Sequence, residues 1–192
     1  TFSHYYCNEK GQNKEQFDAD LKAAQCIAKE NFNIVLQSLV FPRNQFNAEY
    51  LAIAKQNGIK VVRSNPNVWF WENSFKLQQL ARAVDTLFPI SSTLTSEQSK
   101  LINDKVLLLP ASRFLRPYIG SEKHIQKLKF YRIKNEMKFA AINKRVYHLW
   151  WHPHNFGYST NVNLIYLEKI LSYYKKLNTK YGFTSASMIE MY

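Results

Sequence analysis

The chain has 192 residues, of which 46% are hydrophobic and only five are glycine. This length is typical of one domain with a sizeable core, which predicts a single domain over residues 1–192. No apolar run approaches the ~20 residues that a membrane span needs. The net charge of +12 favours anionic surroundings, namely nucleic acid, a charged glycan or a membrane surface.

The 26 Lys and Arg residues are scattered along predicted helix faces, so a solvated basic surface is favoured over a dedicated nucleic-acid patch. Two cysteines, Cys7 and Cys26, are too few for a disulfide framework, and free thiols and one bridge both stay open. The compartment stays open too, with a lean toward a soluble cytoplasmic protein. Because the chain begins at Thr1, we expect a domain entered partway, and a signal peptide could have been lost.

Helical and strand-like patterns alternate along the chain with short connections. In chain order we predict a helix over 17–31, a strand over 33–41, a helix over 48–56, a strand over 59–62, a helix over 75–88, a strand over 106–109, a helix over 122–142, a strand over 145–152, a helix over 162–177 and a helical stub over 186–191. In the helix over 122–142 the expected inner positions are Ile125, Leu128, Ile133, Met137 and Ala140. This alternation is typical of parallel βαβ units.

A doubly wound sheet and a (β/α) barrel both fit this pattern, and the polar residues that follow the strands favour the barrel. These residues are Arg43 and Asn44, Arg63 and Asn65, Ser112 and Arg113, and His152 and His154. In α/β barrels the edge formed by the carboxyl ends of the strands carries the chemistry. Four strands cannot close a barrel, so we expect an irregular (β/α) barrel whose N-terminal strands are missing from this chain.

The segment from His148 to Gly157 contains three histidines and three large aromatic residues. Alternation over 145–152 predicts a strand, and Pro153 ends ladder pairing, so His152 and His154 fall where the strand opens into a loop. Imidazoles in such a place are suited to proton transfer or metal binding. An aromatic core strand with incidental histidines is the alternative, and for His148, in mid-strand, a structural role is favoured.

Four stretches resemble motifs of the polysaccharide deacetylases, carbohydrate esterase family four. They are Thr1-Phe2-Ser3-His4, Phe41-Pro42-Arg43-Asn44, the pair Trp69 and Trp71, and Leu149-Trp150-Trp151-His152. They occur in the order of the family's motifs and extend over nearly the whole chain. The resemblance implies a zinc-dependent hydrolase that removes acetyl groups from an N-acetylated glycan.

The resemblance also implies roles for individual residues. His4 would be a zinc ligand, His152 the general acid that protonates the departing amine, and His154 the second choice for that acid. The remaining ligands and the base Asp are expected before Thr1, so we expect this chain to bind zinc poorly and to be inactive alone. We also expect His4 and His152 to face one cavity.

Arg43 would hold the base Asp in its ionised form, although here Pro42 precedes the Arg, whereas the family has the reverse order. A surface arginine is the alternative. Asp85 could orient the acid histidine, or pair with Arg82 on its own helix. The remaining candidates are substrate-binding residues, each with packing or surface exposure as its alternative, namely Trp69, Trp71, Trp151 and Arg113.

Two further functions stay open. One is a glycan-binding relative that keeps the barrel and has lost the metal. The other is a basic nucleic-acid-binding protein, which no helix-turn-helix, zinc-finger or RNA-recognition motif supports. We therefore expect a glycan partner, no nucleic acid and no membrane span.

Overall fold

The computed structural model describes residues 7, 9, 11, 13–66, 68, 76–85, 94–96, 106–118 and 120–192. It divides into two compact units. The first comprises Thr1–Ser64, Ser99–Leu109 and Ala186–Tyr192, and the second comprises Asn65–Gln98 and Pro110–Ser185. The single domain predicted for residues 1–192 stays a prediction.

Two helices of the first unit confirm the predicted ones. Helix α1 (Lys14–Phe32) begins after Asn13, whose Oδ1 accepts a hydrogen bond from the Gln16 amide at 2.7 Å. It ends at Asn33, which takes a left-handed conformation that asparagine tolerates. Helix α2 (Ala48–Gln56) begins in the same way after Asn47. These caps bind amide groups that have no partner inside a helix.

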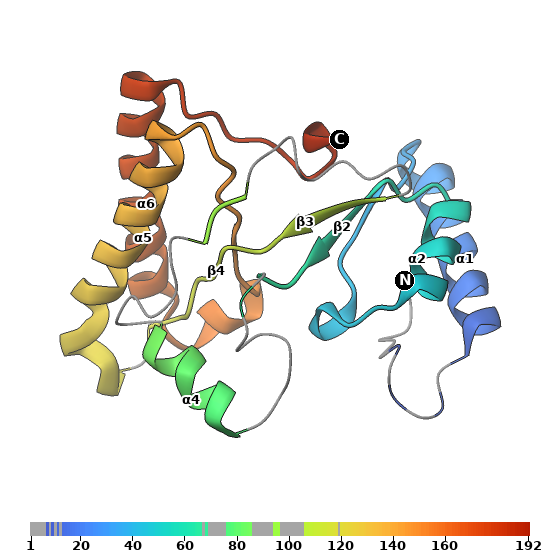
Figure 1. Ribbon diagram of the computed structural model, residues 1–192, viewed down its shortest axis with the longest axis horizontal. Coiled ribbons are helices and arrows are strands. Elements are labelled where there is room, and N and C mark those ends of the chain that lie inside the picture. The colour runs from blue at the N-terminus through green and yellow to red at the C-terminus, as the bar shows by residue number, and fades with distance from the viewer. Residues whose placement is uncertain are drawn as a thin grey trace. The chain divides into compact units, whose positions relative to one another are not determined.

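Three strands of this unit form a sheet in the order β1-β2-β3 (Figure 1). They are β1 (Ser38–Leu39), β2 (Val61–Ser64) and β3 (Leu107–Pro110). Strand β1 pairs with β2 in parallel, with Ser38 opposite Val61. The strand predicted over 33–41 is thus only two residues long, and the exposed side chains of Ile34 and Val35 precede it. Strand β1 lies at the edge of the sheet, where just one neighbour is available for pairing.

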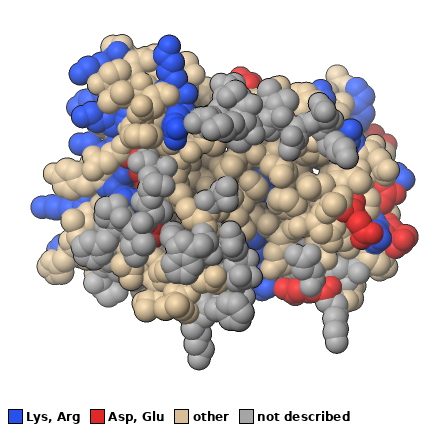
Figure 2. Space-filling view, in the orientation of Figure 1, with Lys and Arg blue, Asp and Glu red and all other residues tan. Residues whose placement is uncertain are grey.

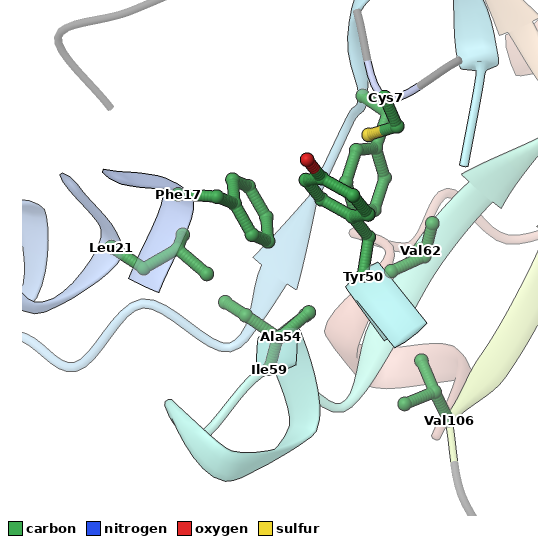
Figure 3. Close-up of a cluster of buried hydrophobic side chains, with 9 residues drawn as sticks. Cys7, Phe17, Leu21, Tyr50, Ala54, Ile59, Val62 and Val106 are labelled. Carbon is green, nitrogen blue, oxygen red and sulfur yellow. The ribbon is translucent and has the colours of Figure 1, made fainter. Parts of the chain in front are cut away.

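The core of the first unit is built around aromatic rings. Phe17 of α1 lies 5.5 Å from Phe41 and 5.1 Å from Tyr50 of α2, measured between ring centroids. Figure 3 shows Phe17 and Tyr50 turned toward one another beside Val62 of β2. Phe41 directly precedes Pro42, and its side chain is 1% exposed. The core therefore fixes the chain at the point where the Arg43 motif begins.

The second unit contains a parallel two-stranded sheet and its helices. The elements are α4 (Lys76–Asp85), β4 (Arg113–Phe114), the 3-10 turn Gly120–Ile125, α5 (Gln126–Ile142), β5 (Leu149–Trp150), the 3-10 segment Pro153–Ser159 and α6 (Thr160–Tyr181). In the sheet Arg113 pairs with Leu149 and Phe114 with Trp150. The three helices were predicted, whereas β4 was not, because two residues are too few to produce a periodic pattern.

Helix α5 departs from the predicted apolar face. Ile133, Met137 and Ala140 are buried as expected. Leu128, however, is 44% exposed, and Glu136 is buried on the same helix with 3% exposure. The inner face of α5 is therefore partly polar, because Glu136 has a basic partner on β4, Arg113, and another on α5 itself, Arg132.

The chain ends with a short 3-10 turn, Ile189–Met191, in place of the predicted helical stub. The described residues form a mixed α/β structure with parallel strand pairs, as predicted, and their two sheets do not close into a barrel. Within the same residues, no helix has the length and apolar character to cross a membrane.

Candidate functional site

His152 lies where β5 ends and the chain turns into the 3-10 segment Pro153–Ser159. Its backbone is extended, at φ −100° and ψ 122°, and its carbonyl accepts a hydrogen bond from the Asn155 amide at 3.0 Å. Pro153 supplies no amide hydrogen, so pairing along the strand cannot continue through it. The strand predicted over 145–152 is observed only at Leu149–Trp150, so His152 follows the strand end by two residues and precedes the turn that begins at Pro153.

Two imidazoles and two aromatic rings meet at this strand exit. The rings of His152 and His154 stack, with centroids 5.2 Å apart and planes 19° apart. The Trp150 ring meets His152 edge-on at 5.4 Å, and the Phe114 ring of β4 lies 6.0 Å from it. Both histidines are exposed. We call Phe114, Trp150, His152 and His154 the histidine edge. An imidazole held against aromatic rings but open to solvent can exchange a proton with a bound molecule.

Trp151, the predicted substrate-binding residue, lies on the other face of this strand. It is half-buried and stacks on the buried Phe156, with centroids 6.2 Å apart and planes 11° apart. Successive side chains of a strand point to opposite faces. Trp150 therefore accompanies His152 at the edge, while Trp151 packs in the core. That alternation is visible in the sequence and could have identified Trp150 as the exposed-face tryptophan.

His148 has a structural role through its backbone. Its amide donates to Ser112 Oγ at 3.0 Å, and its carbonyl accepts from the amides of Ser112 and Arg113 at 2.9 and 3.2 Å. These bonds join the segment before β5 to the start of β4. This favours the structural role anticipated for a mid-strand histidine.

Arg113 and Asp85, two further candidates, belong to a buried group of charges. Arg113 donates from Nε and Nη2 to the two carboxylate oxygens of Glu136, both at 2.6 Å. Asp85 Oδ2 lies 3.4 Å from Arg113 Nη2. Arg132 Nε lies 2.9 Å from Glu136 Oε1, and Arg132 Nη2 lies 3.5 Å from Asp85 Oδ1. The Tyr147 hydroxyl donates to Glu136 Oε2 at 2.9 Å. We call these five residues the charge cluster.

The charge cluster shifts the pKa values of two of its members, Arg113 and Tyr147. Burial disfavours the charge of Arg113, but the hydrogen bonds and attraction of Glu136 outweigh it and raise the pKa of Arg113. Burial, followed by the negative Glu136, raises the pKa of Tyr147 well above its ordinary value. The donors of Arg113 therefore bind carboxylates inside the protein. An arginine that contacts a glycan, or one that lies on the surface, would instead have its donors exposed. The carboxylate of Asp85 is likewise engaged by two guanidinium groups, while the side chain of Arg82 lies outside the described part.

Arg43 lies in the first unit, on a strained stretch of backbone. Arg43 and Asn44 both have left-handed conformations, at φ 53° and 52°, which are uncommon for residues other than glycine. Arg43 Nη1 contacts Glu9 Oε1 at 2.8 Å, and its side chain is 61% exposed. Arg63, which belongs to β2, donates from Nε to Asn44 Oδ1 at 2.9 Å. The polar residues at the ends of β1 and β2 thus meet, as expected for parallel strands.

His4, Trp69 and Trp71 lie outside the described residues. Among the residues that are described, no group of three or more His, Cys, Asp or Glu side chains could hold a metal ion. Within this described part, the stacked imidazoles of the histidine edge belong to no such group, and two imidazoles alone do not make a three-ligand zinc site.

No protein-family model, curated protein or solved structure matches the chain. The resemblance to the polysaccharide deacetylases therefore depends on the sequence motifs alone.

Proposed function

We propose that this chain belongs to a metal-dependent hydrolase that removes acetyl groups from an N-acetylated glycan, on an irregular (β/α) barrel of the polysaccharide deacetylase type. The observation that carries the proposal is the histidine edge. It has two exposed imidazoles at the carboxyl end of a parallel strand, within a motif that resembles that family. In α/β folds ligands bind beyond the carboxyl ends of parallel strands.

In this reaction His152 would donate a proton to the amine nitrogen that leaves when the acetamide bond breaks. An imidazole titrates near neutral pH, with an ordinary pKa of about 6.5, so it can give and regain a proton under physiological conditions. The rings of Trp150 and Phe114 border His152 and limit the orientations of its imidazole. They also present aromatic surface of the kind that packs against the apolar face of a sugar ring.

His154 supports the same role in a second way. Its ring stacks on that of His152, so both imidazoles lie side by side and exposed at the same strand exit. His154 is accordingly the second candidate for the general acid.

Zinc would supply an activated water and a site for the oxyanion in the implied reaction. The described residues do not form its ligand set. The proposed role of Arg43 is to hold the base Asp in its ionised form. Its guanidinium is exposed and already donates to the Glu9 carboxylate, which supports a role in binding a carboxylate.

The test measures acetate released from N-acetylglucosamine oligomers by the longest natural form of the protein that contains this sequence. We expect His152→Gln to lower kcat by about 10²–10⁴-fold, the usual contribution of a general acid, and His154→Gln to have a smaller effect. His124→Gln is the matched control, because His124 is also exposed and lies outside the histidine edge.

Three results would contradict the proposal. They are full activity of His152→Gln, equal losses in His152→Gln and His124→Gln, and the absence of any acetate release. Binding of the oligomers without acetate release would instead support the non-catalytic glycan-binding alternative.

A further inference from the structure

The positive charge of the chain is concentrated in one stretch of the second unit. Between Pro110 and Ser185 there are 14 Lys and Arg residues and three Asp and Glu residues, a net charge of +11 out of +12. Figure 2 shows Lys and Arg gathered over the region that α5 and α6 occupy in Figure 1. The charge is therefore not spread evenly along the sequence, and among the described residues α5 and α6 carry six exposed lysines.

Helices α5 and α6 run in the same direction. The Phe130 ring of α5 meets the Tyr166 ring of α6 at 6.0 Å. One turn further along α5, Lys134 Nζ lies 4.7 Å from the Tyr173 ring of α6. Because the contacts advance together along both helices, their carboxyl ends lie on the same side of the unit.

Exposed lysines collect at these two carboxyl ends. They are Lys138, Lys144, Lys175, Lys176 and Lys180. We call them, together with Ile142 and Tyr181, the basic end. Between Met137 and Ser185 the sequence contains a single acidic residue, Glu168. It precedes Lys180 by 12 residues of α6, about 18 Å along the helix axis. Carboxyl ends of helices attract cations through the helix dipole, but one or two lysines satisfy that preference.

The side chains among these lysines distinguish between anionic partners. Ile142, the last residue of α5, is 50% exposed, and Tyr181, the last residue of α6, is 37% exposed. An aliphatic and a tyrosyl side chain surrounded by lysines suit the boundary between lipid headgroups and acyl chains. A nucleic acid or charged glycan offers no comparable apolar phase for Ile142. Lysine also suits a diffuse anionic surface better than arginine, whose fork recognises individual phosphates.

The basic end lies opposite the histidine edge within the second unit. Strands β4 and β5 are parallel, α5 connects them, and α6 follows β5, so the helices run against the strands. The histidine edge follows the carboxyl end of β5, next to the start of α6. Helix α6 has 22 residues, so its carboxyl end lies about 33 Å along the helix axis from its start, at 1.5 Å per residue.

We infer that the basic end docks on the surface of an anionic lipid membrane, with the histidine edge facing away from it. The lysines attract the anionic headgroups, and Ile142 and Tyr181 enter the interfacial layer. This inference does not depend on the proposed deacetylase activity, since it concerns residues at the other end of the unit.

The test is cosedimentation with phosphatidylcholine vesicles that contain no phosphatidylglycerol or about one third of it. We expect binding to the anionic vesicles alone, weakened by salt. The double variant Lys176→Glu with Lys180→Glu should bind at least about thirtyfold more weakly, given about 1 kcal/mol, or fivefold, for each basic residue near an anionic surface. The control is Lys29→Glu with Lys55→Glu, which makes the same charge change on α1 and α2 and should bind as the parent protein does.

A second variant distinguishes a membrane from a polyanion in solution. Ile142→Ser should weaken vesicle binding several-fold and leave binding to polyphosphate unchanged, because only the membrane accepts an apolar side chain. The inference is overturned if the protein does not bind anionic vesicles, if both double variants bind equally, or if Ile142→Ser has no effect on vesicle binding. Circular dichroism verifies that each variant is folded.

Discussion

Arg113 and Phe114 are consecutive residues of β4 with opposite surroundings. Arg113 lies in the charge cluster, buried and bound to Glu136 through two hydrogen bonds. Phe114 lies in the histidine edge, with its ring 4.6 Å from Trp150 and 6.0 Å from His152. Because successive side chains of a strand point to opposite faces, one residue serves the interior and the next serves the candidate site.

This difference shows that a polar residue near the end of a strand can either be paired inside the protein or be exposed at a candidate site. The same argument selected Arg113 and His152, since each lies near the end of a strand. Arg113 is neutralised inside the protein, whereas His152 remains exposed. The two regions should therefore respond oppositely to substitution, one through the stability of the fold and the other through activity.

The largest effect on stability is expected for Glu136→Ala. Removing this carboxylate leaves Arg113 and Arg132 with Asp85 as the remaining carboxylate of the charge cluster, which should cost about 3–5 kcal/mol of unfolding free energy. Urea denaturation measures the loss. Glu168→Ala on the exposed face of α6 is the control and should change stability by less than about 0.5 kcal/mol. Equal losses in the two variants would show that the charge cluster does not stabilise the fold.

A smaller effect is expected for Tyr147→Phe, and it depends on pH. Burial and the nearby Glu136 raise the pKa of Tyr147 well above 10.0, its ordinary value. Above pH 10 the unfolded chain releases the phenolic proton while the folded chain keeps it, so stability falls as pH rises. Tyr147→Phe should make this alkaline fall less steep, and should cost about 1.5 kcal/mol at neutral pH through the lost hydrogen bond to Glu136.

The control for this prediction is Tyr158→Phe, since the Tyr158 side chain is 89% exposed. Its urea midpoints between about pH 9 and pH 11, about one unit on either side of the ordinary tyrosine pKa, should match those of the parent protein. Parallel curves for Tyr147→Phe and the parent would contradict the assignment of the alkaline fall to Tyr147.

The smallest effect on stability is expected at the histidine edge. His152→Gln should change the unfolding free energy by less than about 0.5 kcal/mol, because the imidazole is exposed and its neighbours pack on each other without it. Thermal denaturation measures this. Together with a large loss of acetate release, this would separate a chemical role of His152 from a structural one. If His152→Gln instead lost as much stability as Glu136→Ala, the result would indicate a structural role of His152 and contradict this prediction.

Much of the helical structure could be predicted because its determinants are local. Asn13 and Asn47 accept hydrogen bonds from the first amides of α1 and α2, and such caps are visible in the sequence. Strand lengths could not be predicted in the same way. The alternation over 145–152 extends beyond β5, because the number of paired residues depends on the neighbouring strand.

In the candidate site too, the features that depend on adjacent residues could be predicted, and those that depend on distant residues could not. The exit of the strand at His152 followed from Pro153, and the position of Trp150 beside His152 follows from strand alternation. The contribution of Phe114 could not be predicted from the sequence, since β4 is two residues long and lies 35 or more residues before His152 and His154. His4 and the two loop tryptophans stay predictions.

By itself the sequence determined which regions form α1, α2, α4, α5 and α6, to within a few residues at their ends, and that strand pairing stops before Pro153, because these depend on hydrogen bonds and torsion angles of adjacent residues. Only the tertiary structure decided which charges are buried. Glu136 is interior because Arg113 and Tyr147 reach it from other parts of the chain and Arg132 reaches it from one turn earlier on α5. Without these partners, burying its carboxylate would be too costly.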